Sequence, residues 1–221
     1  MRAALLCGLA VLAGLVFGPA VAQAQAWELC IREEFDGSMD SGWQWMEGGD
    51  PDIYSLEERE GFLQIAVQPN IPGLISGALL RPAQDEDFVL ETKVLFEPRA
   101  NFEKASIVVW GDLDNHMLLS RAFCSFVQWG CVHNGIYFDR MGSPENFALE
   151  TAEQDVAWLR VTKTGRQVLG EYSGDGVTWQ RIGTHELDFS GTLRIGVAAT
   201  GSQDPLSSPP AYFDYVRIEY P

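Results

Sequence analysis

FVLETKVLFEPRANFEKASIVVWGDLDNHMLLSR, residues 88–121, is the stretch of the chain that decides the fold. It contains three apolar runs, which are separated by a polar bend and by the turn at 111–115. Runs rich in β-branched and aromatic residues, bounded by Gly, Asp and Asn, are typical of antiparallel strands joined by hairpins. The stretch therefore predicts three consecutive strands.

The rest of the 221-residue chain has the same character. Short strand-like runs alternate with turn signals at a spacing of roughly 8–12 residues, which is typical of a β-sandwich. Turns such as 164–165 and 174–176 contain the glycines that positive φ requires. No segment after the N-terminal region predicts a helix longer than a turn or two. We expect an all-β fold, with two antiparallel sheets in one domain over residues 27–221.

The turn at 111–115 also suggests a strand register. If Gly111 pairs with His116, Trp110 lies opposite Met117 and shares an outer face with Arg121. The other face then carries small and aliphatic residues suited to the core, namely Ala105, Ile107, Val109, Leu118 and Ser120. A slip of one residue would reverse the faces of one strand.

The N-terminus resembles a secretory signal peptide. Arg2 provides a positive charge, and an apolar run follows at 3–17. Small residues then suggest cleavage after Ala24 or after Ala26. We expect residues 1–26 to be removed and the mature protein to be secreted or periplasmic, without a membrane anchor.

The chain has a net charge of −16, and loss of Arg2 with the leader makes the mature protein one unit more negative. A protein this acidic repels nucleic acid and anionic lipid surfaces. It suits a neutral or cationic partner, or a bound cation. Acidity that merely keeps an exported protein soluble is the alternative.

Three cysteines remain after export. We expect a disulfide between Cys124 and Cys131, because they are seven residues apart and an oxidising compartment favours the bond. Cys30 is then the odd cysteine, either a buried thiol or one available for an intermolecular bridge.

Several segments resemble the concanavalin A-like lectin/glucanase superfamily. They are similar to domains of unknown function of the DUF1349 type and to the C-terminal β-sandwich of family 43 β-xylosidases. The resembling segments, in order, are 33–37 (EEFDG), 42–46 (GWQWM), 56–65, 88–121, 158–183 and 211–220. The resemblance implies a jelly-roll sandwich with a concave face, a fold that hosts lectins, hydrolases, lyases and spacers. In the xylosidases this domain follows a catalytic propeller, whereas here we expect it to stand alone behind its signal peptide.

Carboxylates at the spacing of a glucanase strand are missing. Glucanases of this fold resemble one another in a Glu-x-Asp-x-(x)-Glu run, which places alternate carboxylates on one face, as a retaining pair requires. The acidic segments 57–60, 85–87 and 112–114 have the wrong spacing or lie outside strands. A pair assembled from different strands stays open, as does chemistry by His116 with Tyr137. We expect no catalytic residues.

Aromatic residues suggest sugar binding. Trp and Tyr stack on the apolar face of a pyranose, while polar side chains bind its hydroxyl groups. The candidate ligand-binding residues are Trp110, His116, Arg121, Trp129 and Tyr137. For each aromatic residue, packing in the core is the alternative.

Calcium is the cofactor that the resemblance implies. Asp36 and Asp214 lie on the first and last strands, which such sandwiches place side by side, and hard oxygen ligands suit Ca²⁺. The alternative is that Asp36 is a turn residue and Asp214 accepts backbone hydrogen bonds.

We therefore expect an exported, lectin-like protein that binds an oligo- or polysaccharide without its own catalytic apparatus. A glycan-active hydrolase or lyase of the same fold is one alternative. A structural or partner-binding envelope protein, with Cys30 as its handle, is another. The sequence leaves the oligomeric state open.

Overall fold

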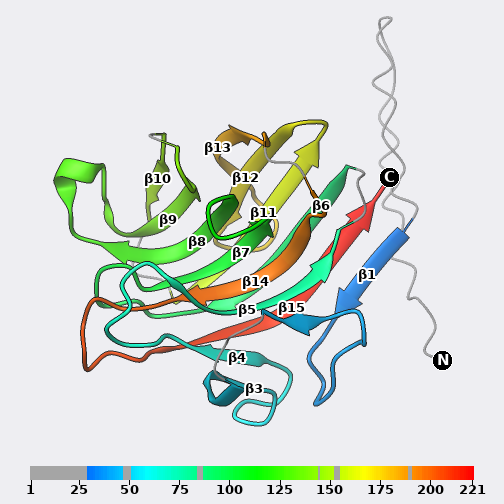
Figure 1. Cartoon of the computed structure of the whole chain (residues 1–221), viewed down its shortest axis with the longest axis horizontal. Helices are drawn as coiled ribbons and strands as arrows, with labels where there is room; N and C mark the ends of the chain where they lie inside the picture. Colours follow the sequence, from blue (N-terminus) through cyan, green and yellow to red (C-terminus); the bar gives the residue numbers. More distant parts are fainter. Residues whose placement is uncertain (1–28, 47–50, 84–86, 144, 152–154, 189–190) are drawn as a thin grey trace, which may run out of the picture.

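The computed structural model describes residues 29–46, 51–83, 87–143, 145–151, 155–188 and 191–221. Their strands form two antiparallel sheets that pack face to face (Figure 1). The predicted signal peptide, 1–26, lies outside the described residues. None of the described segments forms a helix that is long and apolar enough to cross a membrane.

The first sheet has eight strands. Its order is β13 (Gln180–Glu186), β12 (Gln167–Ser173), β11 (Val156–Thr164), β6 (Phe88–Leu95), β15 (Pro210–Tyr220), β4 (Leu63–Ala66) and β3 (Tyr54–Ser55), with β1 (Leu29–Glu33) also paired to β15. β1 and the end of β15 lie on the opposite side of the molecule from β9 and β10 (Figure 1).

The second sheet has seven strands. Its order is β10 (Phe147–Glu150), β9 (His133–Arg140), β8 (His116–Cys124), β7 (Lys104–Trp110), β14 (Arg194–Thr200), β5 (Ile75–Pro82) and β2 (Gln44–Trp45). Two short 3₁₀ helices, η1 (Pro51–Ile53) and η2 (Val127–Trp129), lie in loops. The prediction of an all-β sandwich of two antiparallel sheets is confirmed.

The stretch 88–121 forms three strands, as predicted, but they do not form one meander. β6 pairs with β11 and β15 in the eight-stranded sheet, whereas β7 and β8 belong to the seven-stranded sheet. The polar bend at 96–103 is therefore a crossing between sheets and not a hairpin. This crossing places strands from one continuous stretch on both sides of the core.

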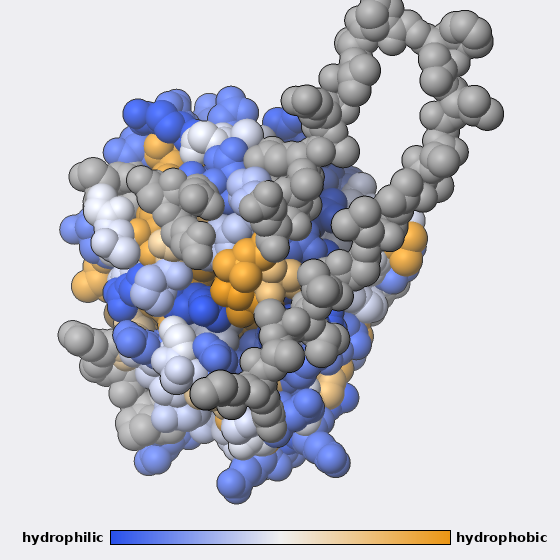
Figure 2. Space-filling view, turned by 90° about the vertical axis from the view of Figure 1, so that its right-hand side faces the viewer, coloured by the Kyte–Doolittle hydropathy of each residue, from blue (hydrophilic) through white to orange (hydrophobic). Residues whose placement is uncertain are grey.

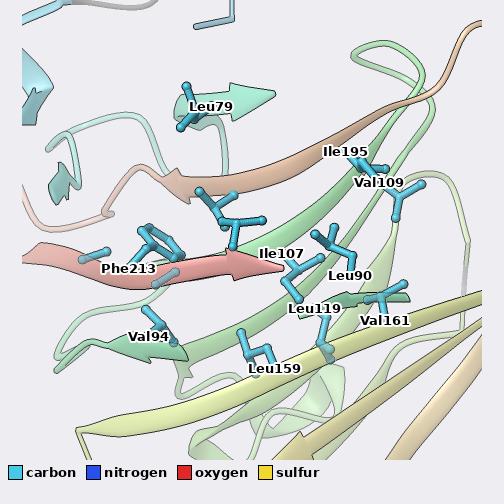
Figure 3. Close-up of a cluster of buried hydrophobic side chains, with 14 of the residues drawn as sticks. Leu79, Leu90, Val94, Ile107, Val109, Leu119, Leu159, Val161, Ile195 and Phe213 are labelled. Atoms are coloured by element: carbon cyan, nitrogen blue, oxygen red, sulfur yellow. The ribbon is translucent and has the colours of Figure 1, made fainter. Parts of the chain in front are cut away.

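The core lies between the two sheets (Figure 3). Ile107 and Leu119 of the seven-stranded sheet and Leu90 and Leu159 of the eight-stranded sheet are all fully buried in one cluster. Alternate residues along each strand enter this cluster because successive side chains in a strand point to opposite faces. The side of the molecule that carries β1 is largely hydrophilic, with a compact hydrophobic patch near its centre (Figure 2).

The predicted register of the hairpin between β7 and β8 is wrong by one residue. Trp110 pairs with His116, and Val109 pairs with Met117. The loop is one residue longer than expected because Asp112 accepts hydrogen bonds from the Asp114 amide and the Asn115 side chain, which stabilise it. The predicted faces of β7 are correct, but those of β8 are reversed.

Cys124 and Cys131 form the predicted disulfide, with their Cα atoms 5.3 Å apart. Cys30 is also disulfide-bonded, and none of the cysteines in the described segments is free. The prediction that Cys30 is the odd cysteine concerns the mature chain without residues 1–26, and it stays a prediction.

Candidate functional site

A cavity of about 140 Å³ lies against the outer face of the seven-stranded sheet, where β7 begins and β8 ends. Its lining comes from β7, β8, β9, β10 and the loops that join them. The lining residues are Phe102, Lys104, Ala122, Phe123, Cys124, Trp129, Gly130, Cys131, Tyr137, Asp139, Asn146 and Ala148. We call this cavity the candidate sugar site.

The floor of the candidate sugar site is built by strand pairing. Lys104 pairs with Ala122, which pairs with Gly135 on β9, so Tyr137 and Asp139 further along β9 point to the same outer face. Lys104 Nζ donates a hydrogen bond to Asp139 Oδ2, and the two side chains are 19% and 23% exposed. The floor therefore presents a cation and an anion that remain accessible to a ligand.

Trp129 forms one wall and is 63% exposed. It ends η2, inside the loop that the Cys124–Cys131 disulfide closes. Gly130 follows with φ of +77°, a left-handed conformation that Gly adopts without strain. The disulfide and this turn hold an exposed tryptophan at the mouth of the cavity.

Contacts outside the disulfide also fix this loop. Phe126 packs between Phe102 and Trp129, with ring centroids 5.7 Å and 4.5 Å apart. Asn101 Oδ1 accepts hydrogen bonds from both the amide and the hydroxyl of Ser125, at 2.6 Å and 3.0 Å. The wall is therefore ordered before any ligand arrives, which reduces the entropy lost on binding.

Tyr137 lines the cavity, and its hydroxyl group bonds to the protein itself. It donates to the His133 carbonyl at 2.8 Å and accepts from the Val132 amide at 3.0 Å. Burial raises the pKa of Tyr137. The hydroxyl therefore fixes the start of β9 and is poorly suited to act as a base.

Trp110 and His116 form a separate pair on the same outer face. Their rings stack with centroids 5.2 Å apart, and they are only 3% and 6% exposed. Burial lowers the pKa of His116, which favours the neutral ring. Neither residue lines the candidate sugar site. The structure thus brings Trp129 and Tyr137 together at one site, and Trp110 and His116 together elsewhere.

Arg121 lies on the opposite face of β8 from the one predicted. It pairs with the core residue Ala105 and is 2% exposed. Its guanidinium donates to the Gly135 carbonyl at 3.4 Å and to Asn134 Oδ1 at 3.3 Å. The one-residue error in register explains this misplacement, and Arg121 supports β9 from the interior.

The predicted calcium residues, Asp36 and Asp214, have different surroundings in the structure. Asp36 is exposed, and Asp214 Oδ2 accepts a hydrogen bond from Lys93 Nζ at 2.6 Å. The Lys93 ammonium group is therefore bonded to a carboxylate oxygen that would otherwise be available to a calcium ion. Within the described part of the chain, His, Cys, Asp and Glu form no group of three or more suited to a metal. Calcium binding by Asp36 and Asp214 stays a prediction.

The candidate sugar site offers little to acid–base catalysis. Asp139 is the only carboxylate among the residues that line it, and that carboxylate is paired with Lys104. A retaining or inverting glycosidase needs two carboxyl groups flanking the scissile bond. The arrangement is suited to holding a ligand.

Three site residues were missed by sequence reasoning: Lys104, Asp139 and Asn146. Lys104 and Asp139 are 35 residues apart and meet only because β7, β8 and β9 are neighbours. Asn146 immediately precedes β10. Alternation along β7 could have placed Lys104 on the outer face beside Ser106, but no local pattern indicates its partner.

Two antiparallel sheets packed face to face are consistent with a concanavalin A-like domain. Residues 32–219 match the family described as Beta xylosidase C-terminal Concanavalin A-like domain. The chain belongs to this family. None of the curated proteins matches the sequence.

Solved structures agree with this assignment. The GH43 protein BlXynB from Bacillus licheniformis superposes with a TM-score of 0.74 at 20% identity, over 86% of this chain and 39% of that protein. Xylan β-1,4-xylosidase from Bacillus halodurans gives 0.70 at 22% identity, over 85% and 38%. The metal-free lectin I-B4 from Griffonia simplicifolia gives 0.59 at 12% identity, over 86% and 98%. The chain therefore spans about two fifths of the bacterial proteins, and likeness at these identities shows the fold alone.

Proposed function

We propose that this protein is an exported carbohydrate-binding β-sandwich that holds one sugar unit of an oligo- or polysaccharide in the candidate sugar site. The observation that carries this proposal is the exposed Trp129, fixed by a disulfide-closed loop beside the outward-facing Lys104–Asp139 pair. An exposed and rigidly held aromatic ring is suited to stack on the apolar C–H face of a pyranose. The polar groups beside it are suited to bind the hydroxyl groups of the sugar.

Each lining group has a role in this proposal. Trp129 stacks on the apolar C–H face of the sugar. Asp139 accepts hydrogen bonds from hydroxyl groups, Lys104 donates them, and the amide of Asn146 does both. The cavity of about 140 Å³ is smaller than the roughly 300–1,000 Å³ of sites for drug-sized ligands. We therefore propose that it takes a single ring, with the rest of the glycan extending into solvent.

The comparisons support a carbohydrate ligand. Relatives in the same fold include a xylan β-1,4-xylosidase and a lectin. The Cys124–Cys131 disulfide supports export, because such bonds persist in oxidising compartments. Binding is favoured over catalysis by the single carboxylate in the site.

Calorimetric titration against a panel of soluble plant, algal and bacterial glycans tests the proposal. We expect at least one class of neutral glycan to bind at a single site per protein. We also expect binding to survive a chelator, because the cation in the site is the Lys104 ammonium. If no glycan binds, with calcium or without it, the proposed function is wrong.

A further inference from the structure

A second cavity, of about 580 Å³, lies where β6 and β15 meet the start of β11. Its volume falls within the roughly 300–1,000 Å³ of small-molecule sites. It shares no lining residue with the candidate sugar site. We call it the Arg59 cavity, and the lining residues that bear on its ligand are Arg59, Glu97, Arg99, Asp155, Leu206 and Tyr212.

Arg59 is held in place by aromatic rings. Its guanidinium carbon lies 4.3 Å from the ring centroid of Phe62 and 5.2 Å from that of Tyr212. These contacts fix the guanidinium group while leaving its N–H edge able to bind a carboxylate. Phe62 and Tyr212 also meet edge to face, with centroids 6.4 Å apart, so the support is itself packed.

Arg59 forms no ion pair with any carboxylate of the described residues. The absence of such an ion pair is notable because the chain has 31 acidic residues and only 15 basic ones. Most of the other described basic side chains have an acidic partner, including the exposed Arg166, which pairs with Glu186. A cation that rests on aromatic rings and has no anionic partner among the described residues, at a cavity of this size, suits an anionic group of a ligand.

The same cavity offers acceptors for hydroxyl groups. Glu97 pairs with Arg99 at 2.8 Å, and these side chains are 59% and 72% exposed. Asp155 is exposed and forms no ion pair with a cation of the described segments. Ionised carboxylates only accept hydrogen bonds, so their partners on a ligand must be donors. The lining therefore fits a molecule that carries one carboxylate and several hydroxyl groups.

Leu206 adds an exposed apolar side chain to the cavity, on a segment anchored by hydrogen bonds. Leu206 is 93% exposed, although its amide is anchored to Asp204 Oδ1 at 2.8 Å. The next residues are also anchored, since Ser207 Oγ donates to Glu103 and Ser208 Oγ donates to the Val67 carbonyl. An apolar side chain on an anchored backbone segment suits the C–H face of a sugar ring.

We propose that the Arg59 cavity is a second binding site and that its ligand is a sugar acid of the hexuronate class. The guanidinium of Arg59 pairs with the carboxylate of the sugar, Glu97 and Asp155 accept its hydroxyl groups, and Leu206 covers its apolar face. The site is separate from the candidate sugar site and does not require that site to function.

Calorimetry with D-glucuronate, D-glucose and acetate tests this proposal. We expect glucuronate to bind at least tenfold more tightly than glucose, which lacks the carboxylate, or acetate, which lacks the hydroxyl groups. We expect its affinity to fall as salt is raised, because exposed charges are screened. Absence of glucuronate binding, or equal binding of glucose or acetate, overturns the proposal.

Variants localise the site. Arg59→Gln should weaken glucuronate binding at least tenfold, whereas Arg166→Gln, which removes a charge from the exposed turn between β11 and β12, should not change it. Trp129→Ala should also leave glucuronate binding unchanged, which separates this site from the candidate sugar site. Amide chemical shifts in the wild-type protein should move at Arg59 and Ser207 on addition of glucuronate. Wild-type affinity in Arg59→Gln, or shifts confined to the Trp129 loop, contradicts the proposal.

Discussion

Glu103 is a fully buried carboxylate whose hydrogen bonds join two loops. It accepts hydrogen bonds from the amides of Arg99 and Ala100, at 2.7 Å and 3.1 Å, and from the hydroxyls of Ser202 and Ser207. The bend at 96–103 and the loop before β15 are thereby held together. This one side chain fixes parts of both cavities, since Phe102 lines the candidate sugar site and Ser207 lines the Arg59 cavity.

Glu103→Gln should lower the free energy of unfolding by about 1–3 kcal/mol, because an amide in place of the carboxylate removes one acceptor from this buried network. Urea denaturation followed by tryptophan fluorescence measures the change. The matched control is Glu97→Gln, an exposed residue whose ion pair with Arg99 should contribute about 0–1 kcal/mol. Equal effects of the two substitutions would show that the network around Glu103 does not stabilise the fold.

Sequence reasoning identified single residues unevenly. The flanking cysteines and Gly130 are local signals that predict a closed polar loop around Trp129, and the structure has this loop. Arg121 was placed on the wrong face, because Asp112 lengthens the turn by hydrogen bonds that the spacing does not reveal. Asp139 was not identified, because its partner Lys104 comes from a strand two positions away in the sheet.

The loop between β8 and β9 is the element on which the candidate sugar site depends. Its disulfide closes only a short segment, and the large core between the sheets does not include it. Removal of the bond should therefore affect the local order of Trp129 more than the fold as a whole.

The double variant Cys124→Ser/Cys131→Ser tests this separation. We expect a loss of about 2 kcal/mol in unfolding free energy from the small closed loop. We also expect faster proteolysis at 125–130 and weaker glycan binding, because the wall must be ordered during binding. Thermal denaturation, limited proteolysis and calorimetry measure the three effects. Wild-type affinity in a variant with a proteolysed loop would exclude a role for this loop in binding.

The strands were easier to predict than their arrangement. β6, β7 and β8 follow from apolar runs bounded by turn residues. That β6 belongs to the other sheet follows from its pairing with β15, more than a hundred residues later in the chain. The order of the resembling segments along the chain carries information about such long-range pairings. Hydrophobic periodicity alone does not.

At the scale of the whole molecule, an acidic β-sandwich that contains a disulfide bond is consistent with an exported protein. Mass spectrometry of the protein recovered from a secreting host should show a mature chain that begins at Gln25 or Trp27. This result follows from cleavage after Ala24 or Ala26 by signal peptidase. A protein that retains Met1 through Ala26 in the exported fraction would contradict the predicted signal peptide.

The central claim is that Trp129 in its closed loop binds sugar. Calorimetry with the best-binding neutral glycan of the panel, on the variants Trp129→Ala and Val127→Ala, tests it most directly. Val127 is 67% exposed on the same 3₁₀ helix but does not line the cavity. We predict that Trp129→Ala weakens binding about tenfold or more, which corresponds to about 1.4 kcal/mol, while Val127→Ala binds as the wild type does. Equal affinity of Trp129→Ala and the wild type would contradict the account.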